Sequence, residues 1–399
     1  MKIKIILLLL VQVLARKRSN YIKAASNFTS LGYKCGFSVE EIDVQTEDGY
    51  ILKMFHIEGD KRRPVLLLHG IVDSADTFIL RGQNSLAATL AREGYDVWAA
   101  NTRGSTYSRR HVTLEPSDKR FWEFTFHEVG YYDLPAFINH ILKVNGVKKL
   151  SAVAHSQGNT NFYVLGATRP EYNEKVRVLT SLGPVCFLTY VPTVFELMIQ
   201  SRIVINEVLL AFDEEEIFSP SLRKFIRYWC TETVMRVRIC RDIFFELAGK
   251  DEQEFEEEFV PVVLNHYPTA TSRRNIMHLA QISEKTRFSQ YDFGRAQNLK
   301  VYNAVSAPEY DLGKVTMPVA LFVGKNDKLT SAKDVRLLLN SLPNIVEYRQ
   351  MSRDQFNHID HVWGRNMDAY LFPHVLKVLK KVLIVERENW IQKAIIKKA

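Results

Sequence analysis

Cysteine is scarce in this sequence, and recognisable metal-binding spacing is missing from it. The chain has 399 residues and only 4 cysteines, which excludes a small fold held together by disulfides. It contains no Cys-x-x-Cys pair and no Cys/His spacing suited to zinc. His127-Glu128 begins like a His-Glu-x-x-His motif, but Tyr131 occupies the place of the second histidine. We therefore expect no metal site.

The sequence also has few long apolar runs. The apolar run at Ile5–Leu14 spans about 10 residues, roughly half the length needed to cross a bilayer. It follows a basic start at Lys2 and precedes the small residue Ala15, which is the pattern of a cleaved signal peptide. We predict that residues 1–15 are removed and that the protein is secreted. A retained anchor and a lysosomal destination are the alternatives.

Charge of one sign is concentrated only in short clusters, which for the basic residues are Arg16-Lys17-Arg18, Lys380-Lys381 and Lys397-Lys398. Lys and Arg total 53 against 45 Asp and Glu, a net charge of +8, but the basic residues are dispersed and do not alternate with aromatics. This pattern disfavours nucleic-acid binding and is typical of a solvated basic surface. Hydrophobic residues make up 46% and aromatics 11%, enough for a large core in one big domain or two smaller ones.

The cysteines and one sequon fit a secreted protein. Cys230 and Cys240 lie close together in the chain, so we expect them to form a local disulfide, whereas Cys35 and Cys186 are far apart and are expected to be free. Asn27 begins an Asn-Phe-Thr sequence and is a candidate glycosylation site.

Beyond Pro64, buried-strand patterns alternate with helical patterns. This alternation predicts an α/β fold with a parallel sheet covered by helices on both faces, and ligands then bind at the carboxyl ends of the strands. The expected strands are 65–68, 96–100, 150–154, 176–181, 318–323 and 345–349, and the expected helices are 84–92, 133–144, 159–168 and 331–340.

The alternation lapses in the middle of the chain. Residues 187–308 are mainly helical and locally charged, which predicts a helical cap inserted between two parts of the core, 16–186 and 309–380. The tail, 381–399, combines apolar residues with lysines and could form a basic amphipathic helix. We weigh a packed or frayed terminal helix against contact with a lipid or membrane surface.

Ser156 is the candidate nucleophile. It follows the predicted strand 150–154 and directly precedes a helix, the setting of a nucleophile elbow. Such a turn needs small residues two positions before and two positions after the serine. Gly158 meets this requirement, whereas Ala154 departs from it by one methyl group. Taken alone, the motif fits an ordinary loop serine equally well.

A serine needs a base and an orienting acid, which follow in that fold in the order Ser, acid, His. Asp327 comes just after the predicted strand 318–323. His358 and His361 lie further on, and chemistry alone leaves the choice between them open. Asp334 and Asp354 are poorer acids, because one lies within a predicted helix and the other beside the histidine loop.

The negative charge formed on the ester carbonyl also needs two backbone N–H donors. Gln157 follows the nucleophile directly and is one candidate. The other is Ile71, where His69-Gly70 bends the chain after the first strand of the alternating region. We interpret His69 as a turn residue with no role in proton transfer.

Several runs closely resemble the acid lipase family, which comprises the gastric and lysosomal acid lipases and their insect relatives. The resemblance extends from about residue 31 to about residue 379. The runs that carry it are Thr46-Glu47-Asp48-Gly49-Tyr50, Leu67-Leu68-His69-Gly70, Asn101-Thr102-Arg103-Gly104, Gly130-Tyr131-Tyr132-Asp133-Leu134-Pro135, His155-Ser156-Gln157-Gly158, Leu337-Leu338-Leu339 and Asn357-His358-Ile359-Asp360.

The resemblance implies an α/β-hydrolase core with a helical cap and a movable lid. It assigns the catalytic histidine to His358 and matches Ser156, Asp327, Ile71 and Gln157 to the roles given above. It also matches the cap cysteines of the family to the pair at positions 230 and 240, although the spacing in this chain is one residue longer. No cofactor is implied.

The expected function is hydrolysis of triacylglycerol-type neutral lipid esters through an acyl-enzyme. The expected partner is a lipid ester at a lipid–water interface, bound by a monomer. Alternatives within the enzymes are a sterol-ester hydrolase and a general carboxylesterase. A lipid-binding protein without catalysis is a further alternative, although such a protein has no need to keep all three catalytic residues.

Overall fold

The computed structural model describes residues 26–190, 206, 214–285 and 287–396. The predicted signal peptide, 1–15, lies outside the described residues. Among the residues that are described, no helix is both long enough and apolar enough to cross a membrane.

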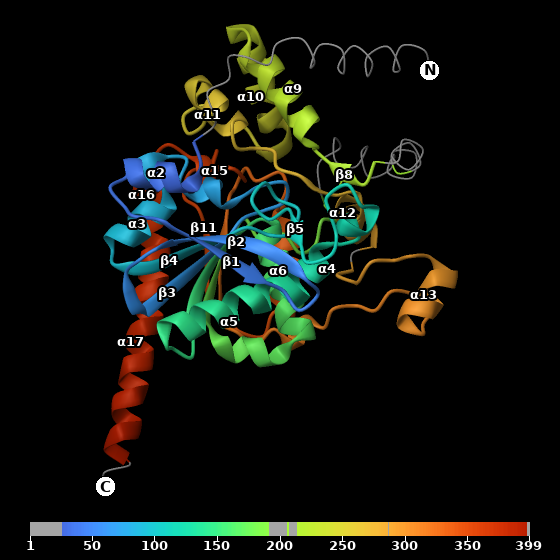
Figure 1. Ribbon diagram of the computed structural model, residues 1–399. Helices are drawn as coiled ribbons and strands as arrows, with labels where there is room; N and C mark the ends of the chain where they lie inside the picture. The colour runs from blue at the N-terminus through green and yellow to red at the C-terminus, as the bar shows by residue number, and fades with distance from the viewer. Residues whose placement is uncertain (1–25, 191–205, 207–213, 286, 397–399) are drawn as a thin grey trace.

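A mostly parallel sheet forms the centre of the molecule (Figure 1). In the described part of the chain it has nine strands, in the order β1-β2-β4-β3-β6-β7-β10-β11, with β5 paired to β2. The pairs from β4 to β11 are parallel, whereas β2 is antiparallel to its three neighbours. The bounds are β1 Glu40–Gln45, β2 Tyr50–Ile57, β3 Asp60–Leu68, β4 Tyr95–Ala100, β5 Arg110–His111, β6 Leu150–His155, β7 Val176–Leu182, β10 Val319–Val323 and β11 Ile345–Gln350.

The sheet separates two hydrophobic cores. Every residue of β4, β6, β7 and β10 is buried, as expected for parallel strands covered on both faces. Side chains of one strand alternate between the two cores, so that Val65 and Leu67 enter one while Leu66 and Leu68 enter the other.

Helices cover both faces. Apolar residues of α3 and α17 contribute to one core, and those of α5 and α6 to the other. The helices outside the middle region are α2 Phe28–Lys34, α3 Leu86–Arg92, α4 Phe126–Glu128, α5 Leu134–Asn145, α6 Gln157–Thr168, α14 Ala332–Ser341, α15 Asp360–Trp363, α16 Met367–Tyr370 and α17 Phe372–Ile396.

The region between β7 and β10 carries short helices and one small hairpin. Figure 1 shows α9, α10 and α11 lying together beyond one end of the sheet, while α13 lies on a separate arm. The bounds are β8 Glu216–Ile217, α9 Pro220–Thr231, α10 Val234–Ala248, α11 Val260–Leu264, β9 Thr271–Ser272, α12 Arg273–Lys285 and α13 Arg295–Tyr302. We retain 187–308 as the proposed cap.

A disulfide joins two helices of this cap. Cys230 near the end of α9 is bonded to Cys240 in α10, with 5.8 Å between their Cα atoms. Cys35 and Cys186 are free and buried. The cysteines therefore pair as the sequence predicted.

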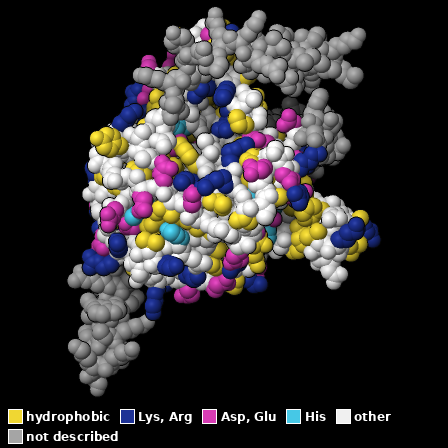
Figure 2. All heavy atoms as spheres, in the orientation of Figure 1, with side chains coloured by type: hydrophobic (Ala, Val, Ile, Leu, Met, Phe, Trp, Pro, Cys, Tyr) yellow, Lys and Arg dark blue, Asp and Glu magenta, His cyan; other side chains and the backbone are white. Residues whose placement is uncertain are grey.

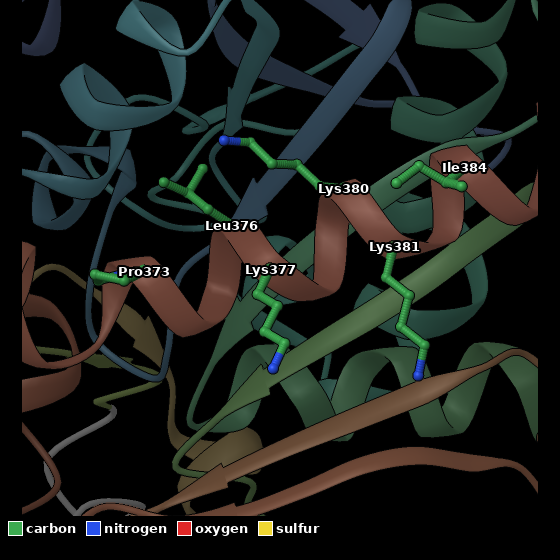
Figure 3. A pocket seen from close by; sticks show the side chains of 6 residues that line it. All are labelled: Pro373, Leu376, Lys377, Lys380, Lys381 and Ile384. Carbon is green, nitrogen blue, oxygen red and sulfur yellow. The ribbon is translucent and has the colours of Figure 1, made fainter.

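The last helix runs past the proposed end of the core. Helix α17 continues without a break from Phe372 to Ile396, and Val382 and Leu383 still pack against the core. Figure 3 shows a shallow surface groove along this helix, lined by Pro373, Leu376, Lys377, Lys380, Lys381 and Ile384. Over the face of the molecule in Figure 2, acidic and basic side chains are interspersed.

Candidate active site

Ser156 lies at the sharp turn between β6 and α6. Its φ of 55° and ψ of −125° place a non-glycine residue in a costly backbone conformation, which proteins keep mostly at functional positions. The turn is held by the Ser156 N–H, which donates to Leu182 O at 3.0 Å. The serine is 6% exposed.

The small residues around Ser156 are required to different degrees. A Cβ atom on Gly158 would lie 2.6 Å from Leu68 O, and one on Gly70 would lie 2.9 Å from the Cβ of Ser156. Ala154, by contrast, is accommodated within the core on that side of the sheet, fully buried. The methyl group that departs from the motif therefore does not distort the elbow.

Asp327 and His358 form a buried pair. His358 donates from Nδ1 to Asp327 Oδ2 at 2.9 Å, and the other carboxylate oxygen accepts the N–H groups of Leu329 and Thr330, each at 2.8 Å. Burial raises the pKa of Asp327, but the charge and hydrogen bond of His358 outweigh it and bring the pKa to about 2. The aspartate is therefore ionised over the whole ordinary pH range.

The second nitrogen of His358 is free to exchange a proton. Its Nε2 is buried and has no hydrogen-bond partner among the described residues. The ring lies beside the elbow, because His155, the residue before Ser156, places its ring centroid 4.8 Å from that of His358. The contact between serine and base is often long in free enzymes and tightens when substrate binds.

The remaining candidates for acid and base are arranged differently. Both ring nitrogens of His361 are buried without a partner in the described chain. Asp334 accepts the hydroxyl of Ser331 at 2.7 Å at the start of α14, and Asp354 forms an exposed pair with Lys325. Of the three aspartates considered, the structure brings only Asp327 to a histidine, and that histidine is His358.

The two expected oxyanion donors flank the serine. Gln157 is the first residue of α6, where N–H groups have no partner within the helix. Ile71 follows Gly70, where an added Cβ would lie 2.9 Å from the Cβ of Ser156, and precedes Val72, which has a φ of 49°. Neither the Ile71 nor the Gln157 N–H donates to another described residue, so both remain available to a ligand.

His69 supports this turn as a neutral residue. Its Nδ1–H donates to Gly70 O at 2.8 Å, and its Nε2 accepts the N–H of Thr102 at 3.2 Å. Burial lowers the pKa of His69 to about 4. This geometry supports the interpretation of His69 as a turn residue.

Comparisons with known proteins find similar chains among the α/β hydrolases and the lipases. Residues 63–364 match a family described as alpha/beta hydrolase fold, and residues 28–82 match a partial alpha/beta-hydrolase lipase region. Lipase 1 of Drosophila melanogaster is 37% identical over 354 residues, which cover 88% of this chain and 78% of the relative. The gastric triacylglycerol lipase of Homo sapiens is 33% identical over 359 residues, covering 87% and 89%.

The chain belongs to the lipase family of the α/β hydrolases.

Membership of this family makes the protein a lipid ester hydrolase, and the predicted fold class and family resemblance are confirmed. The crystal structure of a soluble variant of monoglyceride lipase from Saccharomyces cerevisiae is 15% identical, with a TM-score of 0.53 over 92% of this chain and 99% of that one. That likeness shows the fold alone.

Sequence reasoning missed several residues that hold the site of this hydrolase in place. His155 donates from Nε2 to the backbone oxygen of His358 at 3.0 Å, and burial lowers the pKa of His155 well below its usual value. The residue before Ser156 is thus a neutral donor to the loop of the predicted base. Its position in the motif was visible, but its partner, 203 positions away, was not.

The end of α10 holds both the acid loop and the base loop. Ala248 O accepts the N–H groups of Lys328 and His358 at 3.3 and 3.2 Å. The next carbonyl, that of Gly249, accepts Asn357 Nδ2–H at 3.0 Å. No local pattern in the sequence marks these contacts, because each partner comes from a distant segment.

Asn27, the candidate glycosylation site, begins helix α2. Its Oδ1 accepts the N–H of Ser30 at 2.9 Å as a helix cap, and Thr29 of the same sequon donates its hydroxyl to Glu41.

Among the described residues, no group of three or more His, Cys, Asp or Glu side chains is arranged to hold a metal ion.

Proposed function

We propose that this lipase hydrolyses triacylglycerol-type neutral lipid esters through an acyl-enzyme on Ser156. The observation that carries the proposal is the buried pair of Asp327 and His358, whose unpartnered Nε2 lies beside the strained elbow at Ser156. Such an arrangement is what activation of a serine requires, because an alcohol is a poor nucleophile until a base removes its proton.

In the first half of the reaction, Ser156 Oγ attacks the ester carbonyl while its proton passes to His358 Nε2. The N–H groups of Ile71 and Gln157 donate to the resulting oxyanion, and Asp327 holds the imidazolium in orientation. The ester C–O bond then breaks. The proton moves from His358 to the leaving alcohol, and the acyl group stays on Ser156.

In the second half, a water molecule attacks the acyl-enzyme. His358 takes a proton from this water, the oxyanion again forms between Ile71 and Gln157, and collapse releases the fatty acid while the proton returns to Ser156 Oγ. The ionised Asp327 stays ionised throughout, since its pKa is about 2. No oxidant, reductant or cofactor enters this balance.

The choice of triacylglycerol over other esters rests on the relatives. The human relative with 33% identity is named a gastric triacylglycerol lipase. We further propose that the protein acts as a monomer at a lipid–water interface, with the helices of residues 187–308 as its cap and movable lid.

We also propose that the protein is secreted after removal of residues 1–15 and carries a glycan on Asn27. Expression in a secretory host and sequencing of the N-terminus of the released protein test the cleavage. A mature protein that starts at Met1, or one held in the membrane fraction, would contradict it. Treatment with a glycosidase tests the glycan, with Asn27→Gln as the control.

The decisive experiment measures a panel of esters with the purified protein across a range of pH. Emulsified long-chain triacylglycerol, a sterol ester and a short soluble ester distinguish the proposed lipase from a sterol-ester hydrolase and from a carboxylesterase. A fluorophosphonate probe should label Ser156, and Ser156→Ala should lose both label and turnover. A folded wild-type protein that takes no label would overturn the proposal in favour of lipid binding.

The role of Asp327 has a matched control. Asp327→Asn should lower kcat by about 10⁴-fold, because the histidine loses the carboxylate that fixes its tautomer. Asp354→Asn changes an exposed carboxylate whose only ion pair in the described chain is with Lys325, and it should leave kcat unchanged. Equal activity of the two variants would refute the assignment of Asp327.

A further inference from the structure

A side chain of the proposed cap is paired with the residue after the nucleophile. Asn275, in helix α12, is 4% exposed, and Gln157 is 6% exposed. Gln157 donates from Nε2 to Asn275 Oδ1 at 2.8 Å, and Asn275 donates back from Nδ2 to Gln157 Oε1 at 3.3 Å. Two buried amides that satisfy each other in this way fix one another's orientation.

Asn275 is itself held in place by its neighbours in the cap. Its Nδ2 also donates to Thr271 Oγ1 at 3.1 Å, and its backbone N–H donates to Ser272 Oγ at 2.9 Å. The hydroxyl of Ser272 donates in turn to the backbone oxygen of Phe124, in the core. The amide that meets Gln157 is thus a rigid group.

A second cap residue holds the other side of the oxyanion site. Thr269 is fully buried. Its backbone N–H donates to Val72 O at 2.6 Å, and its hydroxyl donates to Asp73 O at 2.7 Å. Val72 has a φ of 49°, which is unfavourable for a β-branched residue. Thr269 therefore holds a strained turn directly after Ile71.

Between these two supports lies a small cavity. It has a volume of about 20 Å³ and is lined by both Ile71 and Gln157, and by Asn275 from the cap. That is room for about one water molecule. The Oδ1 atom of Asn161, which also lines the cavity, is buried and has no partner in the described chain.

We propose that Asn275 and Thr269 are positioning residues, which hold the Gln157 and Ile71 N–H groups in the geometry that the oxyanion needs. The inference rests on the proposed function, since it assigns no role outside ester hydrolysis. It deepens that function by making the docked cap part of the catalytic arrangement. Loss of one oxyanion donor costs about 10²- to 10³-fold in kcat, so misalignment of one donor should cost less than that.

The test uses the full-length secreted protein and a short soluble ester, which removes lipid adsorption from the measurement. Asn275→Ala should lower kcat by about 10- to 100-fold with KM changed by less than about threefold, because the lost interaction acts on the transition state. Thr269→Val removes the hydroxyl donor at nearly constant volume and should lower kcat as well. Thr269→Ser keeps the hydroxyl and should restore it.

A double-mutant cycle separates positioning from general structural support. Gln157→Ala removes the side chain that Asn275 contacts and keeps the backbone N–H. If Asn275 acts through Gln157, then Asn275→Ala should change kcat less than about twofold in the Gln157→Ala background. Arg274→Ala, next to Asn275 and partly exposed, is the matched control and should behave as wild type.

The outcomes are distinguishable. If wild-type protein hydrolyses esters but Asn275→Ala keeps full kcat while folded, the positioning role is overturned and the proposed function stands. The positioning role also fails if the two substitutions act independently in the cycle. If folded wild-type protein neither hydrolyses esters nor takes the fluorophosphonate label, the proposed function and the inference fall together.

Discussion

Gly158 and Ala154, the small residues on either side of Ser156, differ in the space available for a Cβ atom. A Cβ on Gly158 would meet two backbone oxygens, at 2.6 and 2.8 Å, whereas the methyl group of Ala154 is already accommodated. We expect Gly158→Ala to destabilise the fold by about 1–3 kcal/mol through overpacking and to lower kcat by shifting the elbow. Thermal unfolding and ester kinetics measure both effects.

Ala154→Gly is the matched control for that prediction. The substitution places glycine, the usual residue of the motif, at position 154. It should lower the free energy of unfolding by about 0.5–1 kcal/mol through backbone entropy and leave kcat unchanged. A Gly158→Ala protein as stable and active as wild type would contradict the close contact with Leu68 O.

His155 gives a prediction about the base loop. His155→Phe keeps an aromatic ring but loses the hydrogen bond to His358 O, and a bond of this kind contributes about 0.5–1.5 kcal/mol. We therefore expect kcat to fall by about 2- to 12-fold, measured on a soluble ester. His155→Gln retains a donor and should lose less. Full kcat in His155→Phe together with a loss in His155→Gln would indicate that ring packing matters and the hydrogen bond does not.

Asp73, beside the oxyanion turn, predicts a pH dependence of stability. Burial raises the pKa of Asp73 from 3.8 to about 8, and the nearby Asp76 adds to the effect. Because the folded-state pKa is raised, the stabilising contribution is complete below the unfolded pKa and is lost as pH rises towards 8. Asp73 therefore stabilises the folded protein more in acidic solution than in neutral or basic solution.

The comparison of wild type with Asp73→Asn isolates this contribution, because all other titrating groups are present in both proteins and their effects on stability cancel. We expect the free energy of unfolding of wild type, relative to the variant, to fall between pH 4.5 and pH 8, measured by denaturant titration. A pH-independent difference between the two proteins would contradict a buried, protonated Asp73.

At the scale of residues, the sequence was enough to propose the site residues that follow strand ends. Ser156, Asp327 and His358 could be proposed because their order along the chain reflects the chemistry and the fold together. Asn275 and Gly249 could not, because their partners are set by tertiary structure. The Gln157 to Asn275 bond, for example, joins residues 118 positions apart, and nothing local distinguishes that asparagine from any other on a helix.

At the scale of elements, the end of α10 supports the loops that carry the proposed acid and the proposed base. Gly249, which follows the helix, has a φ of 108°, and a Cβ there would lie 2.0 Å from Asn326 O, next to Asp327. We expect Gly249→Ala to displace the acid loop and to lower kcat strongly, with a clear loss of thermal stability. Kinetics and melting measure the two effects.

A control variant separates the effect of backbone strain from the effect of the close contact with Asn326 O. Gly294 has a φ of 84° but nothing within 4 Å of a Cβ, so Gly294→Ala carries the strain alone. It should cost about 1 kcal/mol of stability and leave kcat unchanged. If both variants behave alike, the acid loop does not depend on the space at Gly249.

The inner strands β4, β6, β7 and β10 could be predicted because they are buried on both faces and contain short apolar runs. The antiparallel strands β1 and β2 were not predicted. Edge strand β1, Glu40–Gln45, is largely exposed and carries three acidic residues, so it shows no apolar pattern. Helix ends shifted by a few residues for local reasons: α3 begins at Leu86, not Asn84, because Ser85 caps it by accepting the N–H of Ala88.

At the scale of the whole molecule, the C-terminal end of the last helix lies far from helices α9 to α11 of the proposed cap. Figure 1 shows the C-terminal end of α17 projecting away from the end of the sheet that carries α9 to α11. A lipid contact at the C-terminal end of α17 would therefore lie away from helices α9 to α11.

Removal of residues 385–399 tests this separation. Since Val382 and Leu383 already pack against the core, we expect the shortened protein to fold and to keep kcat/KM for a soluble ester within about twofold. Binding to lipid vesicles, measured in parallel by sedimentation, reports any tethering. A large loss of soluble-ester activity would show that the end of α17 supports the site.

The pairing of β7 with β10 has a consequence for how the chain is made. β7 ends at Leu182 and its neighbour begins at Val319, so the ribosome must produce the intervening segment before the two strands can meet. At ordinary synthesis rates that takes on the order of ten seconds. Throughout this interval β7, whose residues are all buried in the folded protein, has one unpaired edge, a template for aggregation. We therefore expect the nascent protein to need this edge of β7 shielded until strands β10 and β11 emerge.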